Sequence, residues 1–274
     1  MTITKSQVTV DDLTFDVAVG GPEDGPTVLL LHGFPHNSAS YDGVVPILND
    51  AGLRTITVDQ RGYSPGARPE GVQAYRIPNL VADVIGVLDA LGVARCLLVA
   101  HDWGAIVGWQ LAARHPERFT GYVAVSTGHA GAISEALEHS EDQRKKSSYI
   151  KFFIEEGSEE KLLARNAVLL RRTCPRDAIG PLQEPGALTA ALNWYRANFT
   201  GDIAANTACG RITIPTTMVW SDGDEALGRE QAERTGGFVD ADYRYVELTG
   251  VDHWVPEKAP ERLAELIIER AETA

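Results

Sequence analysis

The chain has 274 residues, of which 44% are hydrophobic, and its 25 Lys and Arg against 38 Asp and Glu give a formal net charge of −13. Nucleic acids are bound by basic faces, so this charge argues against a nucleic-acid partner. Large α/β folds reach about 250 residues as one unit. Length and composition therefore predict an ordinary globular protein that needs no metal or disulfide to hold its core.

The cellular compartment is predicted from the lack of targeting segments and from the cysteine pattern. Residues 1–10 contain no apolar stretch of signal-peptide length, and no run approaches the ~18 apolar residues of a membrane span. Cys96, Cys174 and Cys209 are odd in number and lack C-x-x-C spacing. Free thiols in a reducing cytoplasm are the simplest interpretation, so we expect a cytoplasmic protein without membrane insertion.

Apolar runs alternate with helical patterns along the chain. Apolar residues alternate with smaller or polar ones over residues 13–19, which predicts a strand. We expect this strand to form an antiparallel hairpin with the strand that precedes it. Further strands are expected at Thr27–Leu31, Thr55–Val58, Cys96–Ala100, Tyr122–Val125, Thr216–Trp220 and Tyr243–Leu248. Helical patterns lie between them at Tyr41–Asn49, Ile77–Leu91 and Ile106–Ala113. This order predicts an α/β fold with a mostly parallel, doubly wound sheet covered on both faces.

The alternation stops after Ser126. Residues 128–211 show several helical patterns and no convincing strand, and the strand pattern resumes at Ile212. We therefore expect a core of residues 1–127 and 212–274 and a helical cap of residues 128–211. The cap holds 11 basic and 11 acidic residues, so the whole net charge lies on the core. Its densest charge run, 138–146, is mixed in sign and is interpreted as a solvated helix face or loop.

The most informative segment surrounds Asp102. An apolar strand runs into a turn in which Ala100 and Gly104 lie two positions on either side of Asp102, and a helix follows. Small residues at these positions permit a strained strand-to-helix turn that lifts the central side chain above the sheet. On spacing alone, Asp102 is either a nucleophile on such a turn or an N-cap of the helix.

Other segments favour the nucleophile. His32-Gly33-Phe34-Pro35 directly follows a strand, where this architecture places a loop that supplies one oxyanion-hole N–H. We therefore assign the backbone amides of Phe34 and Trp103 to that hole. Asp224 follows a late strand and His253 follows the last one, which is the α/β-hydrolase order of nucleophile, acid and histidine. Asp222 is a weaker candidate for the acid.

Four motifs together carry a resemblance to a known family over the whole chain. They are His32-Gly33-Phe34-Pro35, Asp59-Gln60-Arg61-Gly62-Tyr63-Ser64, His101-Asp102-Trp103-Gly104 and Asp252-His253-Trp254. The chain resembles the α/β-hydrolase superfamily and, within it, the epoxide hydrolases and the related haloalkane dehalogenases. An Asp nucleophile followed by Trp separates it from the esterases and lipases, which use Ser.

Two cap segments look like those that carry the ring-opening tyrosines of soluble epoxide hydrolases, namely Ser148–Phe153 and Leu192–Arg196. The resemblance places Tyr149 and Tyr195 in those positions. Phenols with a pKa near ~10 can protonate an alkoxide while they stay protonated at neutral pH. An epoxide hydrolase is therefore expected, which forms an alkyl-enzyme ester on Asp102 and hydrolyses it with water activated by His253 and Asp224.

Further expectations concern the pocket and its ligands. Because the cap is neutral overall and has aromatic segments, we expect a small, uncharged, apolar epoxide as substrate. No metal or cofactor is expected, since the histidines are scattered and no nucleotide-binding glycine loop is present. Arg61 and Tyr63 are interpreted as structural. The substrate pocket is expected to include His32, Pro35, Phe152, Trp194 and Trp254.

Two alternatives stay open, as do the particular epoxide and the oligomeric state. A haloalkane or haloacid dehalogenase needs N–H donors for the departing halide. Trp103 supplies one, Phe34 stands where an Asn is expected in the dehalogenases, and Trp194 is the remaining candidate for a second donor. A non-catalytic ligand-binding protein is the less favoured alternative, because all three triad positions are filled.

Overall fold

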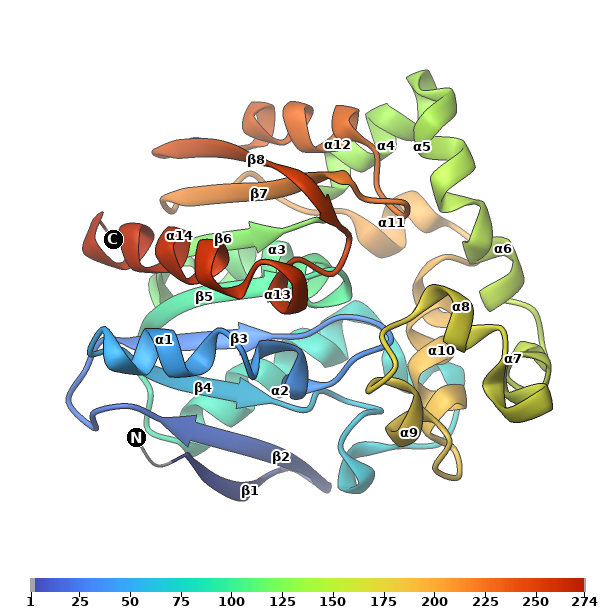
Figure 1. Cartoon of the computed structure of the whole chain (residues 1–274), viewed down its shortest axis with the longest axis horizontal. Helices are drawn as coiled ribbons and strands as arrows, with labels where there is room; N and C mark the ends of the chain where they lie inside the picture. The colour runs from blue at the N-terminus through green and yellow to red at the C-terminus, as the bar shows by residue number, and fades with distance from the viewer. Residues whose placement is uncertain (1–2, 274) are drawn as a thin grey trace.

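A central sheet of eight strands organises the chain in the computed structural model, which describes residues 3–273 apart from the side chain of Thr173. The strands are β1 (Thr4–Val10), β2 (Leu13–Gly20), β3 (Thr27–Leu31), β4 (Arg54–Val58), β5 (Cys96–His101), β6 (Phe119–Val125), β7 (Thr216–Gly223) and β8 (Tyr243–Asp252). They lie in the order β1-β2-β4-β3-β5-β6-β7-β8 (Figure 1). β1 and β2 form an antiparallel hairpin, β2 is antiparallel to β4, and the remaining neighbours are parallel. The predicted α/β fold is confirmed.

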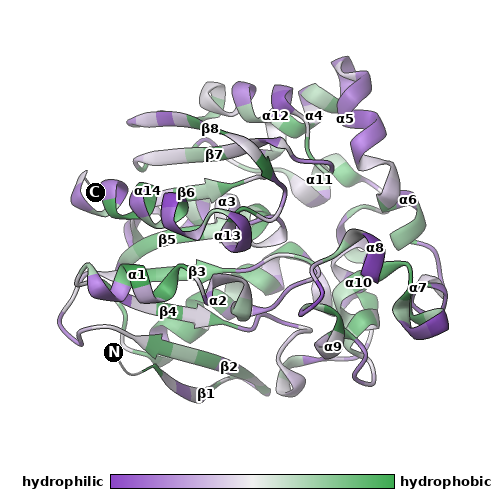
Figure 2. Ribbon diagram, viewed as in Figure 1, coloured by the Kyte–Doolittle hydropathy of each residue, from purple (hydrophilic) through white to green (hydrophobic). Residues whose placement is uncertain are grey.

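Helices cover both faces of the sheet. The core helices are α1 (Val45–Asp50), α2 (Ile77–Ala90), α3 (Trp103–Arg114), α12 (Arg229–Arg234), α13 (Val255–Lys258) and α14 (Pro260–Thr273). In β3, Val28 and Leu30 pack with the side chains of α1 and α14, whereas Leu29 and Leu31 pack with those of α2 and α3. Because both sides of the strand are buried, its sequence is continuously apolar, as the hydropathy colouring in Figure 2 shows for the inner strands.

Two local expectations differ from the structure. The helix expected over 41–49 is divided into the 3-10 turn η1 (Ser38–Tyr41) and α1. Gly43 lies between them, where an added Cβ would come within 3.0 Å of Pro260, and Pro46 occupies the first turn of α1, where its missing N–H does no harm. Ile212, where we expected the strand pattern to resume, forms only an isolated bridge with Val239.

Every regular element between β6 and β7 is helical. These elements are α4 (Ala130–His139), α5 (Glu141–Lys146), η5 (Ser147–Tyr149), α6 (Ile150–Phe153), α7 (Ser158–Ala167), α8 (Leu170–Thr173), α9 (Ile179–Leu182), α10 (Ala187–Asn198) and α11 (Ile203–Thr207). Figure 1 shows α6 to α10 beside the carboxyl ends of the strands. α4 instead contacts α12 and the 3-10 turn η6 (Thr235–Phe238), where His129 stacks on Phe238. The exact cap limits, 128 and 211, stay a prediction.

The helices that the structure describes are too short or too polar for a bilayer. None of them within residues 3–273 is both long enough and apolar enough to cross a bilayer.

Candidate active site

Asp102 lies on a strained turn between β5 and α3. Its backbone has φ 53° and ψ −120°, a conformation that costs a non-glycine residue about 1–3 kcal/mol. A Cβ on Gly104 would come within 2.4 Å of the Leu31 carbonyl oxygen, and one on Gly33 would come within 2.4 Å of the Asp102 side chain. The turn therefore depends on these two glycines. Asp102 occupies the N-cap position of α3 but makes no side-chain capping bond, which excludes the N-cap interpretation.

Two backbone amides hold the Asp102 carboxylate. The Phe34 N–H donates to Oδ1 at 2.8 Å, and the Trp103 amide also bonds the carboxylate. Burial raises the pKa of Asp102, but His253, His101 and the Trp103 amide outweigh it and hold the pKa below its usual value. The carboxylate is thus ionised, and the two amides assigned to the oxyanion hole converge on it.

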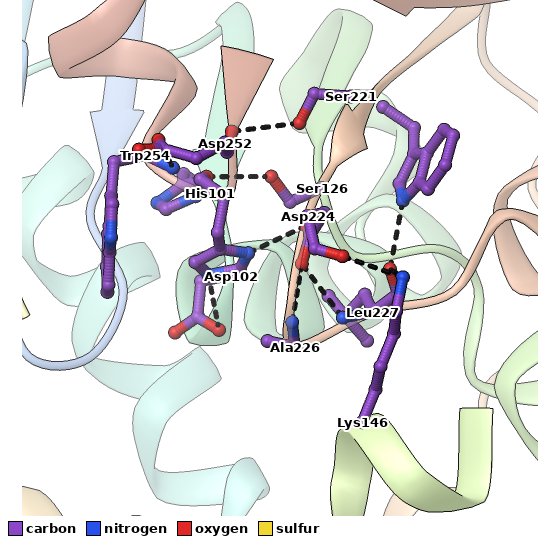
Figure 3. Close-up of polar contacts among 12 residues, drawn as sticks. His101, Asp102, Ser126, Lys146, Ser221, Asp224, Ala226, Leu227, Asp252 and Trp254 are labelled. Atoms are coloured by element: carbon purple, nitrogen blue, oxygen red, sulfur yellow. Dashed lines mark hydrogen bonds and ion pairs between the residues drawn. The ribbon is translucent and has the colours of Figure 1, made fainter. Parts of the chain in front are cut away.

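His253 lies between two carboxylates. Its Nε2 is 3.5 Å from Asp102 Oδ2, and its Nδ1 is 2.8 Å from Asp224 Oδ2. Asp224 is 1% exposed, and its Oδ1 accepts the N–H groups of Ala226 and Leu227 (Figure 3). Asp222, the weaker candidate, is exposed and accepts the Gly250 N–H instead. The geometry therefore selects Asp224 as the partner of the imidazole.

The charge state of His253 follows from these neighbours. Burial lowers its pKa, but Asp224 and Asp102 outweigh burial and raise it well above the usual value. The backbone carbonyl of His253 accepts a hydrogen bond from Ser126 Oγ at 3.2 Å and lies 2.9 Å from His101 Nε2. The sequence analysis gave His101 no role of its own beyond its place in the motif around Asp102. Burial lowers the pKa of this imidazole to about 4.

Two phenols from the cap lie near the same carboxylate. Tyr149 ends η5 and Tyr195 lies on α10, with ring centroids 6.3 Å apart. Burial raises the pKa of both phenols well above 10, and the negative charge of Asp102 raises both further. The structure thus brings together the nucleophile, the imidazole and two protonated hydroxyl groups from four separate segments.

Aromatic rings surround this group. Phe153 contacts Phe34 at 5.2 Å and Tyr195 at 5.1 Å between ring centroids. Phe152, the expected pocket residue, lies 6.3 Å from Phe153 between ring centroids and also beneath the Lys161 ammonium at 5.5 Å. Phe153 was therefore missed, because adjacent positions on a short helix point to different sides and the sequence does not show which side is inside.

Trp194 is buried between the cap and the core. It is 1% exposed, its ring packs against Trp103 and Tyr63, and its indole N–H donates to the Arg61 carbonyl at 2.9 Å. The indole N–H is therefore already engaged by the protein. Arg61 itself forms a bidentate pair with Asp83, which agrees with its structural interpretation.

The other expected pocket residues lie close to the triad. His32 Nε2 accepts the Gln60 N–H at 3.1 Å, and burial lowers the pKa of His32 to about 4, so this imidazole is neutral and orders the oxyanion loop. Pro35 is buried in that loop. Trp254 contacts the His253 ring edge-on at 4.9 Å. Tyr63, interpreted as structural, packs edge-on against His32, and the Asp102 charge adds to burial in raising its pKa.

Metal binding was considered for the same side chains. No group of three or more His, Cys, Asp or Glu between residues 3 and 273 has the arrangement to hold a metal ion.

Comparison with known proteins identifies the family. The model of the alpha/beta hydrolase fold matches residues 26–153. The AB hydrolase superfamily protein YfhM of Bacillus subtilis is 33% identical over 96% of both chains. The chain belongs to the α/β-hydrolase superfamily.

Other members of this superfamily that resemble the chain are epoxide hydrolases. Epoxide hydrolase A of Mycobacterium tuberculosis is 29% identical and aligns over 97% of this chain and 96% of its own length. A solved structure from a study of novel epoxide hydrolases in metagenomes from hot environments superposes over 99% of both chains, with a TM-score of 0.86 and 26% identity. The likeness therefore includes the cap as well as the core.

A buried carboxyl group lies next to the site, on the helix that follows His253. Both carboxyl oxygens of Glu257 are buried without a hydrogen-bond partner among the described residues. His36 Nε2 is 3.7 Å from Glu257 Oε1 and 3.3 Å from Asp177 Oδ2 of the cap. Burial raises the pKa of Glu257 to about 8; Asp177 and Asp252 add to the rise, and His253 opposes it.

This pKa predicts a pH-dependent stability. Folded Glu257 keeps its proton up to about pH 8, whereas the unfolded chain releases it near ~4.3, so the free energy of unfolding falls as pH rises between these values. Glu257→Gln cannot ionise and should therefore gain melting temperature over wild type as pH rises from 5 to 8, by several degrees in thermal unfolding scans. Glu261→Gln, an exposed change on the next helix, is the control. A difference between Glu257→Gln and wild type that does not vary with pH would contradict the assignment.

Proposed function

We propose that this chain is an epoxide hydrolase, which converts an epoxide to a vicinal diol through a covalent ester on Asp102. One observation carries the proposal: the ionised Asp102 carboxylate lies close enough to two protonated cap phenols to raise their pKa, and it lies beside the His253–Asp224 pair of the core. The epoxide hydrolases among its relatives support the same reaction.

The first step uses the carboxylate as nucleophile. Oδ1 is held by the Phe34 N–H, so Oδ2 is the oxygen that attacks an epoxide carbon. As the new C–O bond forms, the ring C–O bond breaks and its electron pair moves to the epoxide oxygen. Tyr149 and Tyr195 hydrogen-bond that oxygen, and one of them supplies the proton. The product is an ester of Asp102 that carries a free hydroxyl group.

The second step uses the imidazole as base. The proton transfer to the epoxide oxygen leaves one tyrosine as a phenolate. Esterification also removes the negative charge of Asp102, which is one of the two charges that raise the pKa of His253, so the imidazole gives up its proton and the phenolate takes it. Neutral His253, oriented by Asp224, then deprotonates a water molecule that attacks the ester carbonyl carbon. The oxyanion forms on Oδ1, where the Phe34 and Trp103 amides stabilise it. When this intermediate collapses, the bond from the carboxyl carbon to the substrate oxygen breaks, and that oxygen takes the proton from His253 to give the diol. The Asp102 carboxyl group then returns a proton to His253, which restores the carboxylate and the protonated imidazole.

The dehalogenase alternative lacks a donor. A departing halide needs several N–H groups, and the indole N–H of Trp194 is bound to the Arg61 carbonyl. The ring of Trp103 packs edge-on against that of Tyr195, with ring centroids 5.1 Å apart, so a phenol lies next to this indole. The phenols instead fit an oxygen leaving group that stays on the product. The ligand-binding alternative is disfavoured because the nucleophile, the acid and the histidine are all in hydrogen-bonding or ion-pair contact.

The substrate we propose is a small, uncharged, apolar epoxide. The rings of Phe34, Phe153, Tyr195 and Trp103 pack against one another, and two of these residues, Phe34 and Trp103, supply the backbone amides of the site. The cap that carries the other two is neutral overall. Cys96 and Cys209 are free thiols, in keeping with a reducing environment. A cytoplasmic location stays a prediction.

The reaction class is tested by product analysis with paired tyrosine variants. Wild type should form a diol from styrene oxide or an epoxy fatty acid and release little halide from a haloalkane panel. Tyr149→Phe and Tyr195→Phe should each lower the alkylation rate by roughly 10-fold or more, because the alkoxide loses a proton donor. Stopped-flow single turnovers measure this rate. Halide release faster than diol formation, or unchanged rates in both variants, would favour the dehalogenase.

The division of labour between the two steps predicts a trapped intermediate. His253→Gln should still be alkylated, since the first step needs no base, but its ester should persist. Intact-protein mass spectrometry should then show a mass increase equal to one substrate molecule, located on Asp102 by peptide mapping. Asp102→Ala is the control that cannot be labelled. Wild-type turnover by His253→Gln would refute the scheme.

A further inference from the structure

The mixed charge run of α5 does not lie wholly in solvent. Gln143 is fully buried, and the Lys146 side chain is only 21% exposed. Both point from the cap toward the core loop of residues 224–228, which carries the catalytic-acid candidate Asp224. Their neighbour Lys145 is exposed. One face of this polar helix is thus committed to a contact with the core.

The contact consists of hydrogen bonds to the backbone of that loop. Lys146 Nζ donates to the Asp224 carbonyl at 2.7 Å and reaches the Leu227 carbonyl at 3.5 Å (Figure 3). Gln143 Oε1 accepts the Gly228 N–H at 2.8 Å. These hydrogen bonds reach both the first and the last residue of the loop. Those from the lysine are the stronger ones, because hydrogen bonds from a charged donor are about twice as strong as neutral ones.

The same helical turn leads to a phenol of the site. α5 continues directly into η5, which ends at Tyr149, three residues after Lys146. The Gln143 amide also donates to Ser147 Oγ at 2.8 Å, which ties η5 to α5. A bonded path therefore runs from the loop of Asp224 to the turn of Tyr149.

Another role for Lys146 would be a surface ion pair with Asp142. Their atoms lie 3.4 Å apart, but the Asp142 side chain is 60% exposed. Exposed pairs of this kind contribute little to stability, because solvent screens them. The shorter contact with the carbonyl of buried Asp224 is the stronger one, so the lysine acts mainly across the cap–core boundary.

We infer that Lys146 is a positioning residue that fastens the cap turn of Tyr149 to the core loop of Asp224, so that the ring-opening phenol and the water-activating pair keep one geometry. The inference rests on the proposed function and adds to it a link between the two steps. It predicts that loss of the lysine impairs both steps, whereas loss of the Tyr149 hydroxyl impairs the first step only.

Kinetics of matched variants test this signature. Lys146→Met should slow alkylation and ester hydrolysis each on the order of 10-fold in single-turnover measurements, because small displacements of reacting groups are costly. Lys146→Arg, whose guanidinium can donate to both carbonyls, should restore both rates to within about 3-fold of wild type. Lys145→Met is the control and should match wild type. If Lys146→Met does not fold, Lys146→Gln takes its place.

Amide hydrogen exchange gives a readout that needs no substrate. The Ala226 and Leu227 amides, which donate to Asp224, should exchange faster in Lys146→Met than in Lys145→Met. Unchanged exchange, slowing of one step alone, or no rescue by Lys146→Arg would overturn the inference. Faster exchange in a protein whose wild type opens no epoxide would instead refute the proposed function and leave the contact standing.

Discussion

The hydrogen bond from the Phe34 N–H to Asp102 Oδ1 is the interaction on which the site depends. It requires the loop after β3 to approach the turn after β5 closely, and only Gly33 and Gly104 leave room for that approach. It also makes the two carboxylate oxygens unequal. Oδ1 is held where the proposed oxyanion forms, and Oδ2 lies 3.5 Å from His253 Nε2. One nucleophile thereby has one oxygen for attack and one for stabilisation.

Electrostatics divide the work between core and cap. Burial favours the neutral form of Asp102 and of the two phenols, and it keeps the phenols of Tyr149 and Tyr195 protonated. Asp102 escapes this effect because His253, His101 and a backbone amide hold its charge. The imidazole in turn depends on the charge of Asp102, so the ester formed in the first step changes the base used in the second.

The core could be predicted from sequence because its signals are local. Buried parallel strands are continuously apolar, and the small residues on either side of Asp102 indicate the strained strand-to-helix turn without reference to any other segment. The cap could be predicted only as a set of helices. Which faces of short polar helices lie inside depends on distant contacts, which is why Phe153, the bound indole of Trp194 and the core contact of Lys146 were not foreseen. The buried Glu257 likewise lacks any local signal.

The covalent ester on Asp102 is the central claim, and a single turnover in oxygen-18 water tests it most directly. With enzyme in excess over epoxide, water attacks the ester carbonyl carbon, so the account predicts that the label enters the Asp102 carboxylate and that the first diol carries none. Mass spectrometry of the Asp102 peptide and of the diol measures both. Label in the diol after one turnover, with an unlabelled Asp102, would show that water attacks the epoxide directly and would contradict the account.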